Sequence, residues 1–176
     1  AVVVRPAGGA PERFDHAILA CHADQALRLL EDPSPLERET LGAFPYRKND
    51  VLLHDDERVM PRRRRAWSSW NYHLDDEAHP GAAVTYWMNG LQRLAAPRQY
   101  FVTLNRPAAV APERVLRRLA YEHPVFTPAG VGAQARHPEL LGHRRTSYCG
   151  AYWRNGFHED GVVSALRACE PFGVAL

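Results

Sequence analysis

One segment near the C-terminus, residues 147–169, constrains the fold of this chain most strongly, because it changes from a strand pattern to a helix pattern across a glycine loop. The segment begins with a short apolar strand at Ser147–Cys149. After the loop, apolar residues recur with the spacing of an amphipathic helix, at Val162, Ala165, Leu166 and Cys169. We predict a strand, a glycine loop and a helix that begins at Asp160 or Gly161, with Asp160 as the N-cap.

This order has a chemical consequence. The first turn of a helix presents free N–H groups and the positive end of the helix dipole, which favour an anionic or electron-rich ligand. Glycine turns before helices are also common in α/β proteins. An ordinary buried terminal helix with no ligand is therefore the alternative.

Composition sets broad limits. The chain has 176 residues, 45% hydrophobic and 24% charged, which is typical of a globular protein with one domain or one domain and part of another. The formal net charge of +2 argues neither for nor against nucleic acid. The three cysteines, at positions 21, 149 and 169, have neither disulfide nor zinc spacing, so we expect a reduced cytoplasm. The sequence contains no membrane-spanning apolar run and no signal peptide.

The N-terminal part has the pattern of an α/β layer. Strands are predicted at 1–5 and 14–20, the second of them buried, and a helix is predicted from Ala23 to Leu30. Asp32–Pro35 then breaks the pattern. Because the chain opens in a β-branched run without Met, we expect it to be part of a longer protein.

The middle of the chain changes character. Short strands with short connections predict an antiparallel sheet, with strands at 50–54, 66–74, 82–87 and 100–104. We also predict an acidic turn at 75–80, a helix at 112–119 and a loop at 137–143. The expected fold is α/β (α+β), with a mainly antiparallel domain inserted into an α/β domain, and the segments are 1–32, 33–144 and 145–176.

Several stretches resemble a known family. Phe14–Leu27 and Tyr148–Ala168 resemble the C-terminal part of FAD-dependent amine-oxidase-like proteins, which include the flavin amine oxidases, protoporphyrinogen oxidase and phytoene desaturases. Trp67–Tyr72, Thr85–Gln92 and Tyr121–Phe126 are similar to a bacterial subgroup of predicted NAD/FAD-binding oxidoreductases associated with lipid metabolism. The resemblance covers most of the chain. It implies the C-terminal part of an FAD-dependent oxidoreductase, in which segments 1–32 and 145–176 belong to the FAD-binding domain and 33–144 is the substrate domain.

The resemblance also implies a cofactor site. The final strand, loop and helix would close over the flavin ring and ribityl chain of FAD. Gly150 and Ala151 would lie near the ribityl–pyrophosphate, and Ala20 and Cys21 beside the dinucleotide. The flavin ring would be contacted by Gly156, Phe157, His158, Glu159, Asp160, Gly161 and Val162. Helix N–H groups would stabilise the negative charge of reduced flavin. His158 or Glu159 is a candidate proton-transfer group, and no catalytic base is assigned.

Two departures from the family matter. Many relatives carry an acidic residue at the position of Ala151, so its ribityl contact is missing or comes from Glu159 or Asp160. No G-x-G-x-x-G motif follows a strand anywhere in the chain. We therefore predict that the chain alone binds FAD weakly or not at all, and that it needs an N-terminal dinucleotide-binding half or a partner chain. The alternative is a non-catalytic fragment that docks to such a partner through an exposed sheet edge near Ala1–Arg5.

Aromatic residues of the middle segment suggest a substrate site. Trp67, Trp70, Tyr86 and Trp87 could line a cavity for a small hydrophobic substrate, or half of them could pack in the core, because alternate strand residues face opposite sides.

The basic run Arg62–Arg65 suggests phosphate, nucleic-acid or membrane binding, or else a solvated loop. We expect no nucleic-acid partner; a membrane surface or acidic lipid is the preferred ligand, which adds membrane association to the cytoplasmic prediction. The histidines form no tight ligand pair, so no metal site is predicted. The cysteines are interpreted as apolar fillers rather than nucleophiles.

Overall fold

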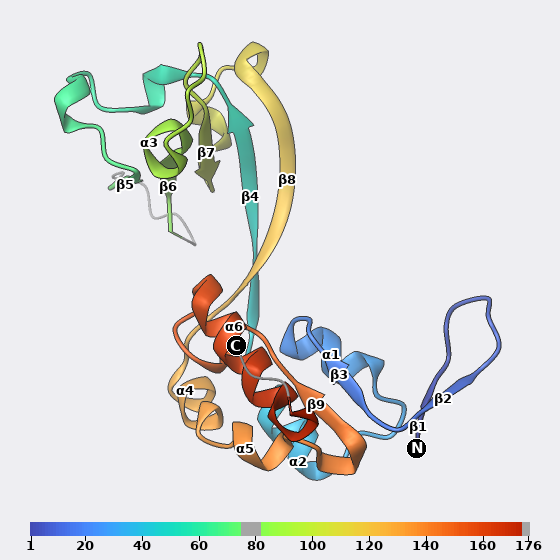
Figure 1. Cartoon of the computed structure of the whole chain (residues 1–176). Helices are drawn as coiled ribbons and strands as arrows, with labels where there is room; N and C mark the ends of the chain where they lie inside the picture. The colour runs from blue at the N-terminus through green and yellow to red at the C-terminus, as the bar shows by residue number, and fades with distance from the viewer. Residues whose placement is uncertain (75–81, 174–176) are drawn as a thin grey trace. The chain divides into compact units, whose positions relative to one another are not determined.

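The structure, a computed structural model, describes residues 1–74 and 82–173 and divides into two compact units (Figure 1). The first unit combines Ala1–Tyr46 with Pro124–Leu176, and the second is Arg47–His123. Residues 33–46 and 124–144, which the sequence analysis assigned to the inserted segment, thus belong to the first unit. The assignment of the segments to FAD and substrate binding stays a prediction. The predicted acidic turn at 75–80 lies outside the described residues.

Within its described residues, the first unit contains two small sheets and five α-helices. β1 (Val2–Val4) pairs antiparallel with β2 (Glu12–Phe14), and β3 (Ala17–Leu19) pairs parallel with β9 (Thr146–Tyr148). The helices are α1 (Ala23–Leu29), α2 (Pro35–Leu41), α4 (Pro128–Gln134), α5 (His137–Leu140) and α6 (His158–Cys169).

Local sequence explains where two of these helices begin. Ser34 caps α2 by accepting from the N–H of Glu37, whose carboxylate accepts from the Ser34 N–H in return, and Pro35 occupies the first helical position. Thr127 caps α4 in the same way, by accepting from the Gly130 N–H. These polar side chains satisfy helix N–H groups that have no partner inside the helix.

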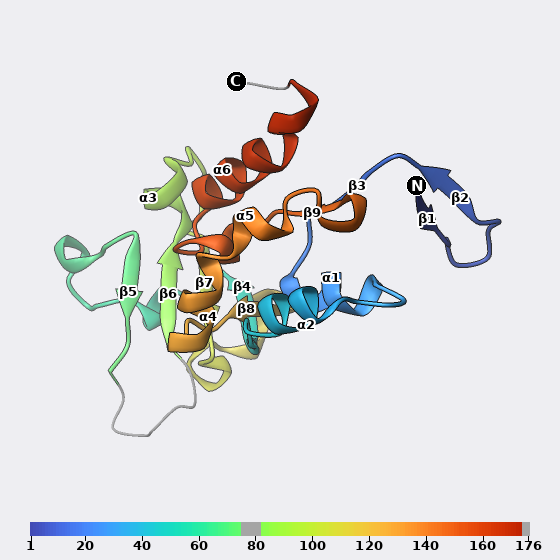
Figure 2. The ribbon, with the colours of Figure 1, turned by 90° about the horizontal axis from the view of Figure 1, so that it is seen from below.

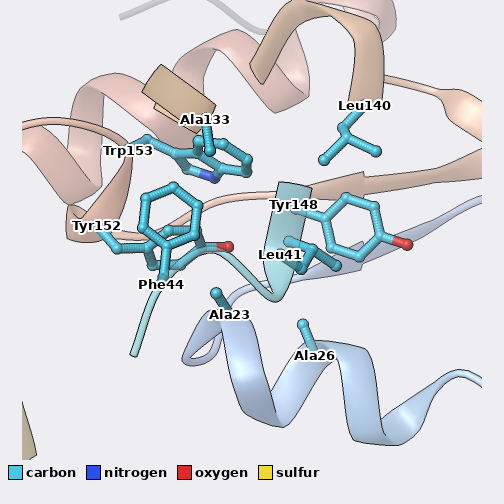
Figure 3. Packing of buried hydrophobic residues seen from close by; sticks show 9 residues of the cluster. All are labelled: Ala23, Ala26, Leu41, Phe44, Ala133, Leu140, Tyr148, Tyr152 and Trp153. Atoms are coloured by element: carbon cyan, nitrogen blue, oxygen red, sulfur yellow. The ribbon is translucent and has the colours of Figure 1, made fainter. Parts of the chain in front are cut away.

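The core of the first unit gathers around aromatic rings (Figure 3). The rings of Phe44, Tyr152 and Trp153 meet edge to face or tilted, with centroids 4.9 to 5.3 Å apart. The small residues Ala23 and Ala26 let α1 approach this core closely, and neither has any exposed surface. The cluster fixes the chain on both sides of β9.

Two predictions for the first unit are wrong. The expected buried strand at 14–20 is divided between β2 and β3, and both Phe14 and Ile18 are exposed. The expected loop at 137–143 begins as α5, because His137 is held inside the core, where its ring stacks on Trp153 at 4.2 Å and its Nε2 lies 2.8 Å from the Tyr148 carbonyl oxygen.

The second unit is organised around one antiparallel sheet with strand order β5-β6-β7-β4-β8 (Figures 1 and 2). Its elements are β4 (Tyr46–His54), β5 (Trp70–Tyr72), β6 (Val84–Trp87), α3 (Met88–Gln92), β7 (Phe101–Leu104) and β8 (Val115–Pro124). The mixed helices and sheets, with this antiparallel sheet, confirm the predicted fold class.

The predicted helix at 112–119 is wrong. Pro112–Arg114 forms one 3₁₀ turn, and the chain then continues as β8, which pairs with β4. The Arg118 guanidinium binds the Asp50 carboxylate of β4 through two hydrogen bonds of 3.0 and 2.6 Å. Pairing with a neighbouring strand therefore overrides the helical spacing of this segment.

Candidate functional site

The final helix begins earlier than predicted, and its first turn is held by Asp160. α6 starts at His158, so Asp160 is the third residue of the helix and not its N-cap. The buried Asp160 carboxylate accepts from the N–H groups of Asn155 (3.1 Å) and Phe157 (3.0 Å). Asp160 therefore does bind N–H groups at the start of the helix, as predicted, but it does so from inside the first turn. Its carboxylate holds the loop that precedes the helix.

Ser164 connects the same helix to the end of β9. Its hydroxyl oxygen accepts from the Gly150 N–H at 2.8 Å and lies within donating distance of the carbonyl oxygens of Gly150 (3.1 Å) and Gly161 (2.8 Å). The buried face of α6 accordingly consists of Asp160, Ser164 and Ala168. The predicted apolar stripe is less buried than this face, and Val162 is exposed.

The two loop glycines have structural reasons of their own. Gly156 has a φ of 88°, which side chains of L residues rarely adopt, and a Cβ there would meet the Phe126 ring at 3.3 Å. At Gly150 a Cβ would lie 2.4 Å from the ring of Tyr152. The loop is therefore shaped by close packing on aromatic rings.

The tip of this loop is open. Residues 154–159 are all exposed, and Phe157 exposes 58% of its surface. The N–H groups of His158 and Glu159 lie in the first turn, where no intrahelical acceptor exists. Because Glu159 and Asp160 carry negative charge in this turn, they offset part of the positive end of the helix dipole.

The parallel pairing of β3 and β9 places two other predicted cofactor residues, Ala20 and Cys21, near the start of the glycine loop. Leu19 is in register with Tyr148, and the Cys149 N–H donates to the Leu19 carbonyl at 3.1 Å. Ala20 and Cys21 thus leave β3 beside the point where Gly150 leaves β9. Ligands of α/β proteins bind outside such carboxyl ends of parallel strands.

Buried groups beneath this edge are held in defined protonation states. Burial raises the pKa values of the Cys21 and Cys149 thiols, which therefore stay protonated near neutral pH. Burial also raises the pKa of Tyr148, whose hydroxyl donates to the Glu37 carboxylate at 2.6 Å. For Glu37, burial acts to raise the pKa, but hydrogen bonds from Tyr148 and Ser34 outweigh it and the net pKa is lowered.

The four predicted substrate residues separate into two pairs on opposite faces of the second unit's sheet. Trp67 packs edge to face on Trp87 (5.4 Å), next to a core cluster that includes Leu52 and Phe101. Trp70 and Tyr86 are cross-strand partners and pack edge to face at 5.2 Å. Residues opposite each other in register share a face, so the four side chains do not line one cavity.

The structure adds residues that the sequence analysis did not select. Ser164, inside α6, and Phe126, in the segment before α4, both shape the glycine loop. Both lie within stretches that resemble the family, but nothing in their spacing marked them as contacts of this loop. Among the described residues, no group of three histidine, cysteine or acidic side chains is arranged to hold a metal ion. No helix within 1–74 or 82–173 is long and apolar enough to cross a bilayer.

Comparison with known proteins finds a similarity in structure but none in sequence. No family model matches the sequence, and no curated protein matches it. Among solved structures, a crystal structure of reduced UDP-galactopyranose mutase matches with a TM-score of 0.60 and 13% sequence identity, over 96% of this chain and 44% of that protein. At this identity the likeness shows the fold alone: the chain shares the fold of a part, less than half, of that protein.

Proposed function

We propose that this chain is the flavin-capping and substrate-facing part of an FAD-dependent oxidoreductase that acts on a hydrophobic, lipid-like substrate. One observation carries the proposal: the carboxyl ends of β3 and β9 meet beside the exposed first turn of α6. The likeness to part of a flavoprotein supports it. The sequence resemblance to amine-oxidase-like proteins motivates the reaction type.

The residues present suit one end of FAD better than the other. The exposed loop tip with its first-turn N–H groups fits a flat, electron-rich ring. The small residues Gly150 and Ala151 leave room for a chain passing along the strand end. Nothing in the sequence supplies the glycine-rich turn that holds a pyrophosphate, so we assign that contact to a dinucleotide-binding segment or partner chain.

When bound, the flavin would supply the hydride-accepting chemistry. Within this chain, Asp160 would keep the loop tip in place through its two N–H contacts, and so fix the first turn of α6 against the ring. Phe157 would cover the ring and exclude water from it. His158 and Glu159, both exposed, are the candidate groups for moving a proton at this edge.

The second candidate function is a non-catalytic module that docks to a chain carrying the dinucleotide-binding fold. Val3 and Val4 of β1 are exposed, and β1 pairs only with β2 among the described strands. Exposed apolar edges of this kind pair with other chains. Both candidate functions require docking to a dinucleotide-binding half. They differ in whether the resulting complex contains flavin, and the flavin content therefore distinguishes them.

The test compares this chain alone with this chain joined to its dinucleotide-binding half, supplied by the DNA upstream of Ala1 or by a separate chain. For the chain alone, quenching of flavin fluorescence is expected to give a dissociation constant no tighter than about 0.1 mM. The assembled protein is expected to be yellow, with one flavin per complex. An assembled protein without flavin would support the non-catalytic module instead.

Phenylalanines near the two ends of α6 provide a matched pair of variants. Phe157→Ala, at the loop tip, is expected to weaken flavin binding by the assembled protein about fivefold, since an aromatic contact contributes about 1 kcal/mol. Phe172→Ala removes a similarly exposed ring (52%) beyond the other end of the helix and is expected to leave binding unchanged. Equal effects of both variants would refute the flavin-capping role.

A further inference from the structure

A second surface of interest belongs to the second unit. It consists of the basic loop Arg62–Arg65 and three residues on and after β5, namely Trp70, Tyr72 and Leu74; we call it the basic edge. Both views of the molecule show the loop beyond β5, which is one of the two edge strands of the sheet (Figures 1 and 2). The proposed oxidoreductase function makes no use of this surface.

Side-chain contacts hold the arginine loop close to the segment that leads into β5. The Trp67 indole N–H donates to the Pro61 carbonyl at 2.8 Å, and the Arg64 guanidinium lies over the Trp67 ring at 4.5 Å. Pro61 and Tyr72 line the same cavity, of about 430 Å³. The arginine loop is therefore folded back beside β5 and not extended away from it.

Among the residues that the structure describes, three of the four arginines of the basic edge have no acidic partner. The acids that precede the loop have arginine partners: Asp56 binds Arg58 at 2.7 Å, and Asp55 lies 3.4 Å from Arg98. Glu57 lies 3.6 Å from Arg64. The other three arginines of the loop, at positions 62, 63 and 65, are exposed and form no ion pair with any described residue.

Large apolar groups are exposed on β5 and directly after it. Trp70, Tyr72 and Leu74 expose 56%, 63% and 91% of their surfaces. Tryptophan and tyrosine favour the boundary between lipid headgroups and acyl chains, because their rings are apolar and each has one polar group. Arginines beside them would reach the phosphate layer.

From this combination we infer that the basic edge docks the protein onto an anionic membrane surface. Nucleic acid is the competing ligand, since arginines and aromatic rings also bind single strands. An exposed leucine gains nothing from stacked bases but does gain from entering lipid.

Vesicle sedimentation tests the inference with the full chain. Binding is expected to phosphatidylcholine vesicles that contain about 30% phosphatidylglycerol, to be much weaker to pure phosphatidylcholine, and to fall as salt is added. Replacing the three unpaired arginines by glutamine (R62Q, R63Q and R65Q) is expected to lower the partition coefficient about a hundredfold. A matched control makes the same charge change at exposed arginines elsewhere, through R13Q, R117Q and R167Q, and is expected to have little effect.

Tryptophan fluorescence gives an independent measurement. Trp70 is the most exposed of the four tryptophans, so membrane docking is expected to shift the emission to the blue, and Trp70→Phe is expected to remove most of that shift. Equal loss of binding in the two arginine triples would reduce the effect to net charge and overturn the inference. Binding to a labelled single-stranded oligonucleotide, with no binding to anionic vesicles, would also overturn it.

Discussion

His54 allows a quantitative prediction about pH and stability. This histidine lies on β4 with no exposed surface, and both ring nitrogens have partners. Nδ1 accepts from the Asp56 N–H at 3.2 Å, so Nε2 carries the proton and donates to the Thr103 hydroxyl at 2.8 Å. A second proton on Nδ1 would face the Asp56 N–H. Burial lowers the pKa of His54 to about 4, despite the opposing effect of the nearby Asp56 and Asp55 carboxylates.

The lowered pKa predicts the sign and size of the effect. Between pH 6.5 and about 4, the unfolded chain binds a proton at His54 that the folded chain does not, so stability falls as the pH falls through this window. The pKa difference of about 2.5 units, at about 1.4 kcal/mol per unit, makes the expected loss about 3 kcal/mol. Above pH 6.5 His54 contributes no pH dependence.

Two measurements check this expectation. The free energy of unfolding can be measured by urea unfolding at pH 7 and at pH 4, followed by circular dichroism. Its decrease from pH 7 to pH 4 is expected to be about 3 kcal/mol smaller in His54→Asn than in the native chain. His158→Asn, at an exposed histidine, serves as the control. The imidazole proton resonance of His54 is expected to titrate near pH 4 in the folded protein. A midpoint near 6.5, or an unchanged pH dependence in His54→Asn, would refute the reasoning.

Two further predictions concern the first unit, and both are measured by urea unfolding at pH 7. Tyr148→Phe is expected to cost about 1 to 3 kcal/mol, because the buried Glu37 carboxylate loses a hydrogen bond; a loss below about 0.5 kcal/mol would contradict this. Gly156→Ala is expected to cost about 1 to 2 kcal/mol because of its positive φ and the Phe126 ring. Gly132→Ala, in an open part of α4, is its control and is expected to stabilise the chain by about 0.5 to 1 kcal/mol.

Sequence patterns located most elements of the fold. The helix from Ala23 was predictable from its apolar spacing. The strand, glycine loop and helix at the C-terminus were predicted in the right order. These elements depend on neighbours within a few residues, which the sequence displays directly.

The wrong predictions concern segments whose structure depends on contacts with other parts of the chain. Residues 112–119 have helical spacing, yet pairing with β4 and the Arg118–Asp50 contact make them part of a strand. His137 looked like a loop residue, but the stacked ring of Trp153 holds it in the core. Asp160 was predicted to precede the helix as its N-cap. It lies inside the first turn instead, where its carboxylate accepts from N–H groups of the loop.

The sequence by itself determined the alternation of strands and helices, the glycine loop before the last helix and the position of the basic loop, because each depends on local spacing and residue type. Only the tertiary structure decided which strand ends meet: β3 and β9 lie far apart in the chain, and their parallel register brings Cys21 beside Gly150. It also separated Trp67 and Trp87 from Trp70 and Tyr86, since the face that a strand residue occupies is fixed by pairing with its neighbours.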